Sequence, residues 1–386
     1  MRILYIHATL TPPPIDSQVD RFFLLSKTLE GDVLHPVWFK KPEEVEAVFG
    51  PGSYPAYTSG NFRYHWFLAY RYRGLRGRLA QFWFYVRKGV ELHREKPFDC
   101  IVAYSHMTTG LMGAIVKLFT GAKLIIEVVT TPNLIYLTDR PRPSFRDRLM
   151  RLYSDLCLHL SLWSCDRAHL LYPEQLNQYP LVRKVPRSVF HEFVPISKIP
   201  VHEADSERFV LLVGAPWYLK GADRLIEAFR RLAPDFPDVK LKLLGWYPDR
   251  KGLDALTAGS RQIEILQARP NPETLQIMRR CEVLVQPSRC EGLPRVVMEG
   301  LATGVPVIGS DVGGIPYLLR DGENGFVVPG GEPAGLAARM RQLLLDGELR
   351  KRLGARGCQQ ARTELNEQVY VERFTEMVTA AVEGKT

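Results

Sequence analysis

Short apolar runs alternate with helical patterns through the second half of the chain, and this alternation constrains the fold more than any other feature. Six runs rich in Val, Ile and Leu are predicted strands: FVLLVGA (209–215), VKLKLLG (239–245), IEIL (263–266), CEVLVQPS (281–288), VPVIGS (305–310) and FVVP (326–329). Helical patterns such as RLIEAFRRLA and RVVMEGLAT separate them. Continuous apolar strands between helices predict a parallel sheet that is covered on both faces.

The first half has the same character with longer interruptions. Its predicted parallel strands are RILYIHA (2–8), CIVAY (100–104), KLIIEVV (123–129) and AHLLYP (168–173). Apolar residues at positions 75, 79, 82, 86 and 90 recur at spacings of three and four, which predicts the buried face of a helix. The tail from residue 336 onward is helical in pattern, with breaks predicted near Gly354 and Gly357.

The segment FVPISKIPVHEADSE (193–207) separates the two halves, because it contains two prolines and then a polar run. A chain of 386 residues is long enough for two domains, each with its own core. We therefore expect an α/β protein with two Rossmann-like halves, an N-terminal domain over 1–195 and a C-terminal domain over 200–365.

Composition and missing motifs exclude several classes of protein. Six scattered cysteines without a CxxC pair argue against disulfides or zinc and suit a reducing cytoplasm. The first apolar run is too short for a secretory signal, and no stretch approaches the roughly 20 apolar residues of a membrane span. GxGxxG, GxxxxGK[ST], GxSxG, HExxH and DxD are all absent. We therefore expect no metal and no nicotinamide or flavin cofactor.

The net charge of +9 has a local source. Residues 61–94 hold eight Lys or Arg against one acid, Glu91, with ten aromatic residues interleaved. One interpretation is a helix pair with buried aromatics and a solvated basic face. The other is a surface for anionic lipid headgroups or a lipid-diphosphate-linked acceptor, since cations and aromatic rings favour the membrane interface. Nucleic acid is not an expected partner, because the chain shows no recognised binding module.

The stretch EGLPRVVMEG (291–300) brackets a predicted helix start with two carboxylates. It follows a predicted strand, and Pro294 suits the first helical position, where its missing N–H costs nothing. The amides of Gly292 and Leu293 would then face the carboxyl edge of a parallel sheet, where such sheets bind ligands. Free amides at a helix N-terminus favour phosphate.

Glu291 and Glu299 suit hydroxyl groups, because carboxylates repel phosphate. Glu291 lies in the loop before the helix, and Glu299 lies about one and a half turns inside it. A ligand with phosphates in its middle and polyol rings at both ends would use the amides and the carboxylates together. A nucleotide sugar is such a molecule.

Two further strand-to-helix junctions face the same edge. In VPVIGSDVGGIPYLL, Gly313 and Gly314 make a predicted tight turn and Pro316 suits a helix start. In VGAPWYLKGADRLIEAF, the strand ends at Gly214, and Lys220 would supply a point positive charge to a diphosphate.

Together these motifs resemble glycosyltransferase family 4, whose members are retaining enzymes of the two-domain GT-B fold. The matching residues are LKGADRLIEAF, EGLPRVVMEGLATGVPVIGSDVGGIPYLL and DGENGFVVPG, in the family's order. The resemblance is strong over 209–345 and is limited to the strand layout over 1–200. It implies two Rossmann-like domains that face each other across a cleft, with the last helix (about 366–386) returning to the N-terminal domain.

The resemblance also implies a donor and a place for each residue. A UDP- or GDP-sugar would bind the C-terminal domain, with Glu299 on the ribose and Glu291 beside the transferred sugar. Lys220 would neutralise the diphosphate, and Arg269 follows the strand that carries the base in relatives. The residues that we expect to bind the donor are Gly214, Ala215, Lys220, Arg269, Glu291, Gly292, Leu293, Pro294 and Glu299. Those that we expect to take part in catalysis are Glu291, Lys220 and His106.

The resemblance further implies that a glycan or lipid-linked acceptor binds the N-terminal domain. Retention in this family is ascribed to front-face attack, in which the leaving phosphate takes the acceptor's proton, so neither a metal nor a protein base is required. The protein would work in the cytoplasm, with residues 61–94 as a candidate contact to the membrane face.

The chain departs from the family pattern at several positions. Relatives carry Arg where Ala215 stands, so Arg295 is a candidate to replace the missing cation at the diphosphate. Relatives also carry Glu where Tyr317 stands. A His usually ends the strand at Val129, and His106 on a neighbouring strand is our candidate substitute. Two other functions therefore remain alternatives: a nucleotide-sugar epimerase of the same fold, and a non-catalytic, membrane-associated binding protein.

Overall fold

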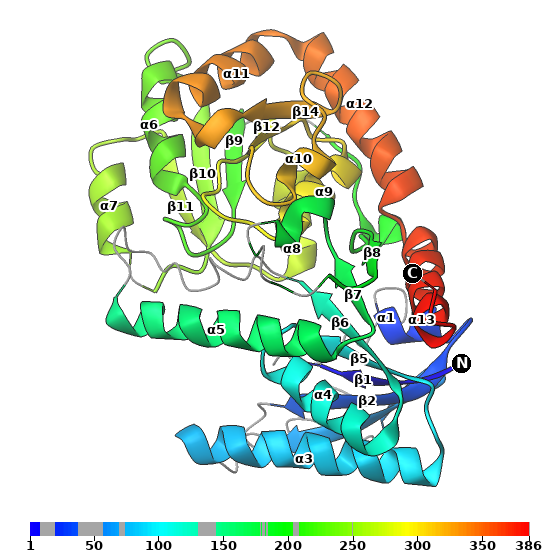
Figure 1. Ribbon diagram of the computed structural model, residues 1–386. Helices are drawn as coiled ribbons and strands as arrows, with labels where there is room; N and C mark the ends of the chain where they lie inside the picture. Colours follow the sequence, from blue (N-terminus) through cyan, green and yellow to red (C-terminus); the bar gives the residue numbers. More distant parts are fainter. Residues whose placement is uncertain are drawn as a thin grey trace. The chain divides into compact units, whose positions relative to one another are not determined.

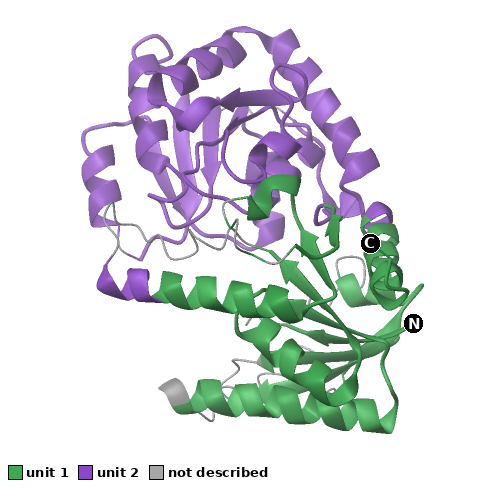
Figure 2. Ribbon diagram, in the orientation of Figure 1, with its two compact units in different colours: residues 1–133, 150–190, 370–386 green, residues 134–149, 191–369 purple. Residues whose placement is uncertain are grey.

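The computed structural model describes residues 1–7, 20–37, 57–68, 74–129, 144–177, 179, 182, 184–203, 208–248 and 250–385 (Figure 1). The chain divides into two compact units (Figure 2). The first unit comprises residues 1–133, 150–190 and 370–386, and the second comprises residues 134–149 and 191–369.

The first unit is built on an eight-stranded sheet with the order β3-β4-β2-β1-β5-β6-β7-β8. Its strands are β1 (Arg2–Ile6), β2 (Glu30–Val37), β3 (Thr58–Ser59), β4 (Phe62–Leu68), β5 (Cys100–Tyr104), β6 (Lys123–Val128), β7 (Arg167–Leu170) and β8 (Arg187–Val189). All described neighbours pair in parallel except β3 with β4. The unit also contains α1 (Arg21–Leu25), α3 (Gly74–Glu95), α4 (Thr108–Thr120) and most of α5 (Phe145–Ser164) and α13 (Glu367–Val382).

The second unit is built on a six-stranded parallel sheet with the order β11-β10-β9-β12-β13-β14. Its strands are β9 (Phe209–Val213), β10 (Lys240–Gly245), β11 (Ile263–Gln267), β12 (Val283–Gln286), β13 (Val307–Ser310) and β14 (Gly325–Val328). Its helices are α6 (Ala222–Leu232), α7 (Lys251–Thr257), α8 (Asn271–Met278), α9 (Arg295–Thr303), α10 (Ile315–Leu318), α11 (Pro333–Leu345) and α12 (Gly347–Glu364).

Both faces of the second sheet are buried, because successive residues of β9 point to opposite sides. Val210 packs in one apolar cluster with Leu225 of α6. Leu211 packs in the other cluster with Leu301 of α9. The predicted parallel sheet with helices on both faces is therefore confirmed.

The strand order of the second sheet is that of a doubly wound fold. From β9 the chain proceeds to β10 and β11 in one direction, and β12, β13 and β14 extend from β9 in the other. The reversal leaves β9 and β12 as neighbours at the centre of the sheet. Ligands bind at such a switch point, beyond the carboxyl ends of the two strands.

Strands β2 and β4 lie outside the predicted strands, because polar residues interrupt their apolar patterns. Asp32 of β2 is fully buried and forms hydrogen bonds with Arg2, Arg63 and His65. Burial alone would raise the pKa of Asp32, but the hydrogen bond from His65 and the charges of Arg2 and Arg63 hold that pKa below its usual value. Paired charges therefore occupy buried positions in strands that the sequence did not predict.

The structure favours the packing interpretation for the aromatic residues of 61–94. Tyr64, Trp66 and Tyr85 are buried, although Trp83 is 57% exposed. The expected helix pair is wrong in its first half, which forms β4. The expected buried position of Leu79 is also wrong: Leu79 is 51% exposed, since none of the described side chains in the first turns of α3 is buried.

The predicted helix breaks near Gly354 and Gly357 are wrong, because α12 continues through both residues. A β-carbon at Gly354 would lie 2.0 Å from the carbonyl oxygen of Gly304, and one at Gly357 would lie 2.8 Å from the side chain of Leu301. These glycines allow α12 to approach α9 closely.

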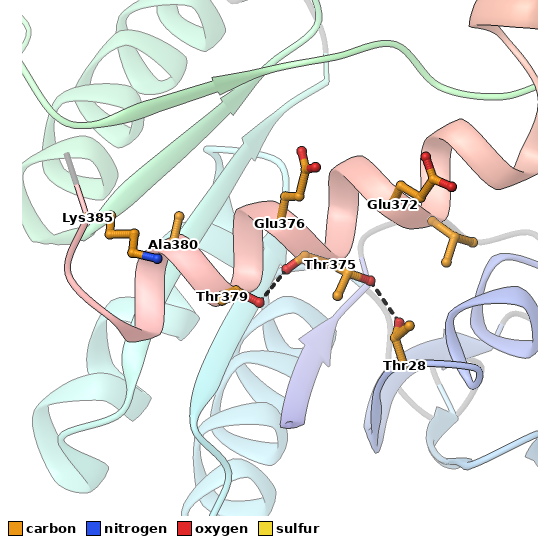
Figure 3. Close-up of a pocket in the computed structure, with 8 residues that line it drawn as sticks. Thr28, Glu372, Thr375, Glu376, Thr379, Ala380 and Lys385 are labelled. Atoms are coloured by element: carbon orange, nitrogen blue, oxygen red, sulfur yellow. Dashed lines mark hydrogen bonds between the residues drawn. The ribbon is translucent and has the colours of Figure 1, made fainter.

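Helix α13 packs within the first unit from residue 370 onward. Its buried Tyr370 makes an edge contact with Phe190, and Phe374 is also buried. Figure 3 shows the outer side of this helix, where the Thr375 and Thr28 hydroxyls form a 2.7 Å hydrogen bond beside a shallow pocket.

Candidate functional site

The predicted donor residues gather at the switch point of the second sheet. Gly214 and Ala215 directly follow β9, and the segment 288–294 follows β12. The loops after β11 and β13 begin at the same edge of the sheet, because all these strands are parallel (Figure 1). Ala215 packs against the core cluster under α6.

Glu291 is 7% exposed and is held by three side chains, from the loop after β9, from the end of β12 and from the loop after β12. Its Oε1 accepts hydrogen bonds from Lys220 Nζ at 2.7 Å, from Ser288 Oγ at 2.7 Å and from Gln286 Nε2 at 3.3 Å. Gln286 also donates to Ser288 Oγ at 3.0 Å. The carboxylate is therefore fixed in orientation by a buried network, and the sequence reasoning missed both Gln286 and Ser288.

Lys220 is brought to Glu291 by a turn that requires glycine. Gly221 has φ +75°, and a β-carbon there would lie 2.1 Å from the carbonyl oxygen of Pro287. This close approach joins the loop after β9 to the loop after β12. Among the described residues, Glu291 is the only hydrogen-bond acceptor for the ammonium of Lys220, which leaves two N–H groups to meet a ligand.

The helix entry after β12 has the expected free amides. Helix α9 begins at Arg295, so Pro294 is the N-cap rather than the first helical residue, one position from the expectation. No described residue accepts a hydrogen bond from the amides of Gly292 or Leu293. The Gly314 amide donates to the Gly292 carbonyl at 2.7 Å, which fixes this loop from the β13 side.

Glu299 is 5% exposed and is bound by residues from two elements. Its Oε1 accepts from Asn271 Nδ2 at 2.9 Å and from Arg295 Nε at 3.0 Å. Asn271 is the first residue of α8, directly after the loop that contains Arg269. Arg295 therefore pairs with Glu299 in this structure. The sequence instead suggests Arg295 as a candidate cation for the diphosphate.

Arg289 locks the two central loops together and was not predicted. Its guanidinium forms a bidentate pair with Asp223, with both N–O distances at 2.7 Å, and lies 3.9 Å from the ring centroid of Tyr218. A planar fork that matches a carboxylate gives a rigid connection. The sequence alone does not indicate this role, because Arg289 and its partner Asp223 lie 66 residues apart.

Two predicted site residues belong to other parts of the structure than these two loops. Arg269 is exposed in the loop after β11. His106 belongs to the first unit and is fully buried, with Nε2 at 3.2 Å from Ser154 Oγ. Burial lowers the pKa of His106 to about 4, so its imidazole is neutral at pH 7. The catalytic role of His106 stays a prediction, and so does the role of Arg269.

The part of the chain that the structure describes holds no group of three or more His, Cys, Asp or Glu placed to bind a metal ion.

Comparison with known proteins connects this geometry to a family. Residues 196–360 match the family model described as "Glycosyl transferases group 1". The match covers most of the second unit, which is therefore similar to the group 1 glycosyltransferases. The predicted resemblance to a glycosyltransferase family is thus confirmed.

Curated relatives match this chain over part of their own length. An uncharacterized glycosyltransferase of Methanocaldococcus jannaschii is 34% identical over 164 residues, which are 42% of this chain and 45% of that protein. A D-inositol 3-phosphate glycosyltransferase of Corynebacterium glutamicum is 33% identical over 174 residues, 43% of this chain and 41% of that protein. The chain thus spans less than half the length of these relatives.

Solved structures resemble the chain along its whole length. Sucrose-phosphate synthase from Thermosynechococcus elongatus has a TM-score of 0.78 at 14% identity and covers 100% of both chains. HepE from Anabaena, in complex with UDP and glucose, has a TM-score of 0.72 at 15% identity and covers 98% of this chain and 99% of that one. At these identities the likeness shows the fold alone, and it confirms the predicted GT-B class with two parallel-sheet domains.

Proposed function

We propose that the protein is a retaining glycosyltransferase that moves a sugar from a nucleotide diphosphate sugar to a glycan or lipid-linked acceptor. The observation that carries this proposal is the arrangement at the switch point of the second sheet. Two enclosed carboxylates, Glu291 and Glu299, flank the free amides of Gly292 and Leu293 and the ammonium of Lys220. The family match of the same unit supports it.

Each part of the site suits one part of such a donor. Glu299, fixed by Asn271 and Arg295, would accept hydrogen bonds from the ribose hydroxyls. The amides of Gly292 and Leu293 would donate to the phosphate oxygens. Glu291 would accept from hydroxyls of the transferred sugar. A structure of HepE contains UDP-glucose, which supports a uridine donor as one of the two proposed classes.

Catalysis would depend on the negative charge that develops on the leaving diphosphate. The ammonium of Lys220 and the N-terminus of α9 would stabilise this charge, which lowers the barrier to cleavage of the bond between sugar and phosphate. The leaving phosphate oxygen would take the proton of the attacking acceptor hydroxyl on the same face. We propose that this chemistry needs no metal ion.

We place the protein in the cytoplasm. All six cysteines are free thiols, which suits a reducing compartment. None of the described helices combines the length and the apolar character needed to cross a bilayer.

A turnover assay tests the proposal. We expect incubation with candidate UDP- and GDP-sugars and an acceptor panel to yield a glycoside, and proton NMR of the new anomeric centre to show the configuration of the donor. An inverted centre would contradict retention. A sugar product formed from donor and water without acceptor would favour the epimerase alternative, and binding without any turnover would favour the non-catalytic one.

A further inference from the structure

Helix α5 carries two rows of apolar side chains, one buried and one exposed. Its inner face buries Cys157, Leu158 and Leu162 within the first unit. A second row of large apolar side chains is exposed: Phe145 (83%), Leu149 (56%), Leu152 (67%), Leu156 (57%), Leu160 (45%) and Trp163 (70%). Spacings of three and four place this row along one side of the helix.

The length of the row separates it from ordinary surface apolar residues. Single exposed leucines are normal on a folded protein, but a contiguous apolar patch marks an interaction surface. Eighteen residue steps separate Phe145 from Trp163, which corresponds to about 27 Å at the helical rise. The inner face packs α5 into the core of the first unit, whereas the side chains of the outer row are 45–83% exposed.

Uncompensated cations flank the row. Arg146, Arg148 and Arg151 of α5 are exposed, and none of them forms an ion pair with another described residue. Arg78 of α3 lies near the same face: burial raises the pKa of Tyr153, and the charge of Arg78 is among the influences that oppose this rise.

The charge of the whole chain is concentrated around these elements. Residues 61–190 contain 20 Lys and Arg against 9 Asp and Glu. The remaining residues contain 31 Lys and Arg against 33 Asp and Glu. The excess of positive charge thus belongs to the part of the chain that carries α3 and α5.

We propose that the outer face of α5 is a docking surface for an anionic lipid bilayer. A helix with a row of Leu, Phe and Trp between arginines suits the plane of the headgroups, where the apolar side chains enter the acyl boundary and the guanidinium groups meet anionic lipids. α5 lies on such a surface rather than across it, because three arginines and two aspartates interrupt its sequence.

A second copy of the chain fits this face less well than lipid does. Two copies of α5 that met along the row would bring arginines together from both sides. The acids of the helix do not offset them, because Asp147 is engaged by Ser144 at the first turn and only Asp155 remains. An anionic bilayer supplies the missing negative charge without geometric constraint.

This inference goes beyond the proposed function, since bilayer binding requires neither donor nor acceptor. It relocates the membrane contact expected for residues 61–94. Most of the described aromatic side chains of that segment are packed in the core, whereas the row on α5 is not, and residues 69–73 lie outside the described residues.

Vesicle flotation with the full chain tests the proposal. We expect binding to phosphatidylcholine vesicles that contain about one-third phosphatidylglycerol and little binding to pure phosphatidylcholine. The double variant Leu152→Gln/Leu156→Gln keeps helix propensity and should weaken binding roughly tenfold or more. Leu345→Gln is the matched control, because Leu345 is 71% exposed on α11, and it should bind like the wild type.

The arginines give a second, independent readout. Arg148→Gln/Arg151→Gln should also weaken binding to the anionic vesicles, and the salt dependence of binding should become shallower than that of the wild type. Circular dichroism and nucleotide binding of every variant should match the wild type, which separates loss of the docking face from loss of the fold or of the donor site.

Three results would overturn the proposal. The first is equal vesicle binding by the Leu152→Gln/Leu156→Gln variant and the wild type. The second is equal binding of the wild type to neutral and anionic vesicles. The third is a wild-type dimer in size-exclusion chromatography that the leucine variant dissociates, without vesicle binding, which would assign the face to a second copy.

Discussion

Glu291 and Glu299 are both enclosed, and each is held by one cation together with neutral hydrogen-bond donors. Glu291 is held by the ammonium of Lys220 together with Ser288 and Gln286, whereas Glu299 is held by Asn271 and Arg295. The first carboxylate thus shares its cation with the proposed diphosphate position. At the scale of single residues, Lys220 has a structural role as well as the proposed catalytic one.

A double-mutant cycle tests this dual role. Lys220→Ala should lower kcat/KM about tenfold or more and should also lower the free energy of unfolding by about 1–3 kcal/mol, because it leaves Glu291 buried without its charged donor. Glu291→Gln should relieve much of that cost, so the double variant should be more stable than the sum of the single losses predicts. Urea unfolding of the four proteins measures the coupling, and strictly additive losses would contradict it.

The sequence predicted the two acids and Lys220, but not the neutral side chains that also hold the acids. The spacing between Glu291 and Glu299 and the glycine-rich loop before α9 are local patterns, and each is visible in one short stretch. Ser288, Gln286 and Asn271 act only through residues that fold next to them. A single polar residue at the end of a strand or the start of a helix is common, so a local pattern could not select these three residues.

At the scale of elements, close helix contacts decide where glycine is required. In a helix, replacing Gly with Ala ordinarily stabilises by up to about 1 kcal/mol. Gly354 lies inside α12, but a β-carbon there would lie 2.0 Å from the backbone oxygen of Gly304. The local propensity and the packing therefore favour opposite residues at this position, and the packing prevails.

We predict opposite signs for two alanine substitutions in α12. Gly354→Ala should destabilise the second unit by about 1–3 kcal/mol, because backbone must move to admit the methyl group. Gly347→Ala should be neutral or stabilising, since its β-carbon would meet only the flexible end of Arg350 at 3.6 Å. Chemical unfolding of both variants provides the measurement, and a stabilising Gly354→Ala would refute the close contact between α9 and α12.

The elements themselves were predictable to different degrees. The strands of the second unit and β1, β5, β6 and β7 were predicted because each lies in a mainly apolar run of the sequence. β2 and β4 were missed because Asp32 is compensated by charges from other strands. The exposed row on α5 was missed as well, because an apolar pattern cannot tell a buried face from an uncovered one.

At the scale of the whole molecule, both units enclose ionisable side chains. The second unit holds the carboxylates of the proposed donor site. The first unit encloses His35 and His106, and burial lowers the pKa of each imidazole to about 4. Both rings are therefore neutral in the folded protein at pH 7 and must gain a proton to reach the acid-unfolded state.

This burial predicts the acid sensitivity of the protein. Each imidazole has its folded pKa below the unfolded value of 6.5, so its contribution to stability is complete above pH 6.5 and is lost as pH falls toward 4. The loss is up to about 3 kcal/mol for each histidine. His106→Asn should flatten the fall of the urea midpoint between pH 6.5 and 4, and an unchanged profile would contradict the burial of a neutral ring.

The central claim is that paired acids around free amides bind a sugar joined to two phosphates. Calorimetric titration of a nucleotide diphosphate sugar into the wild type and Glu299→Ala tests it most directly. The account predicts about tenfold or greater loss of affinity, from one charge-assisted hydrogen bond of about 1.5–3 kcal/mol, while Glu227→Ala on the exposed side of α6 binds like the wild type. Equal affinity of Glu299→Ala and the wild type would contradict the claim.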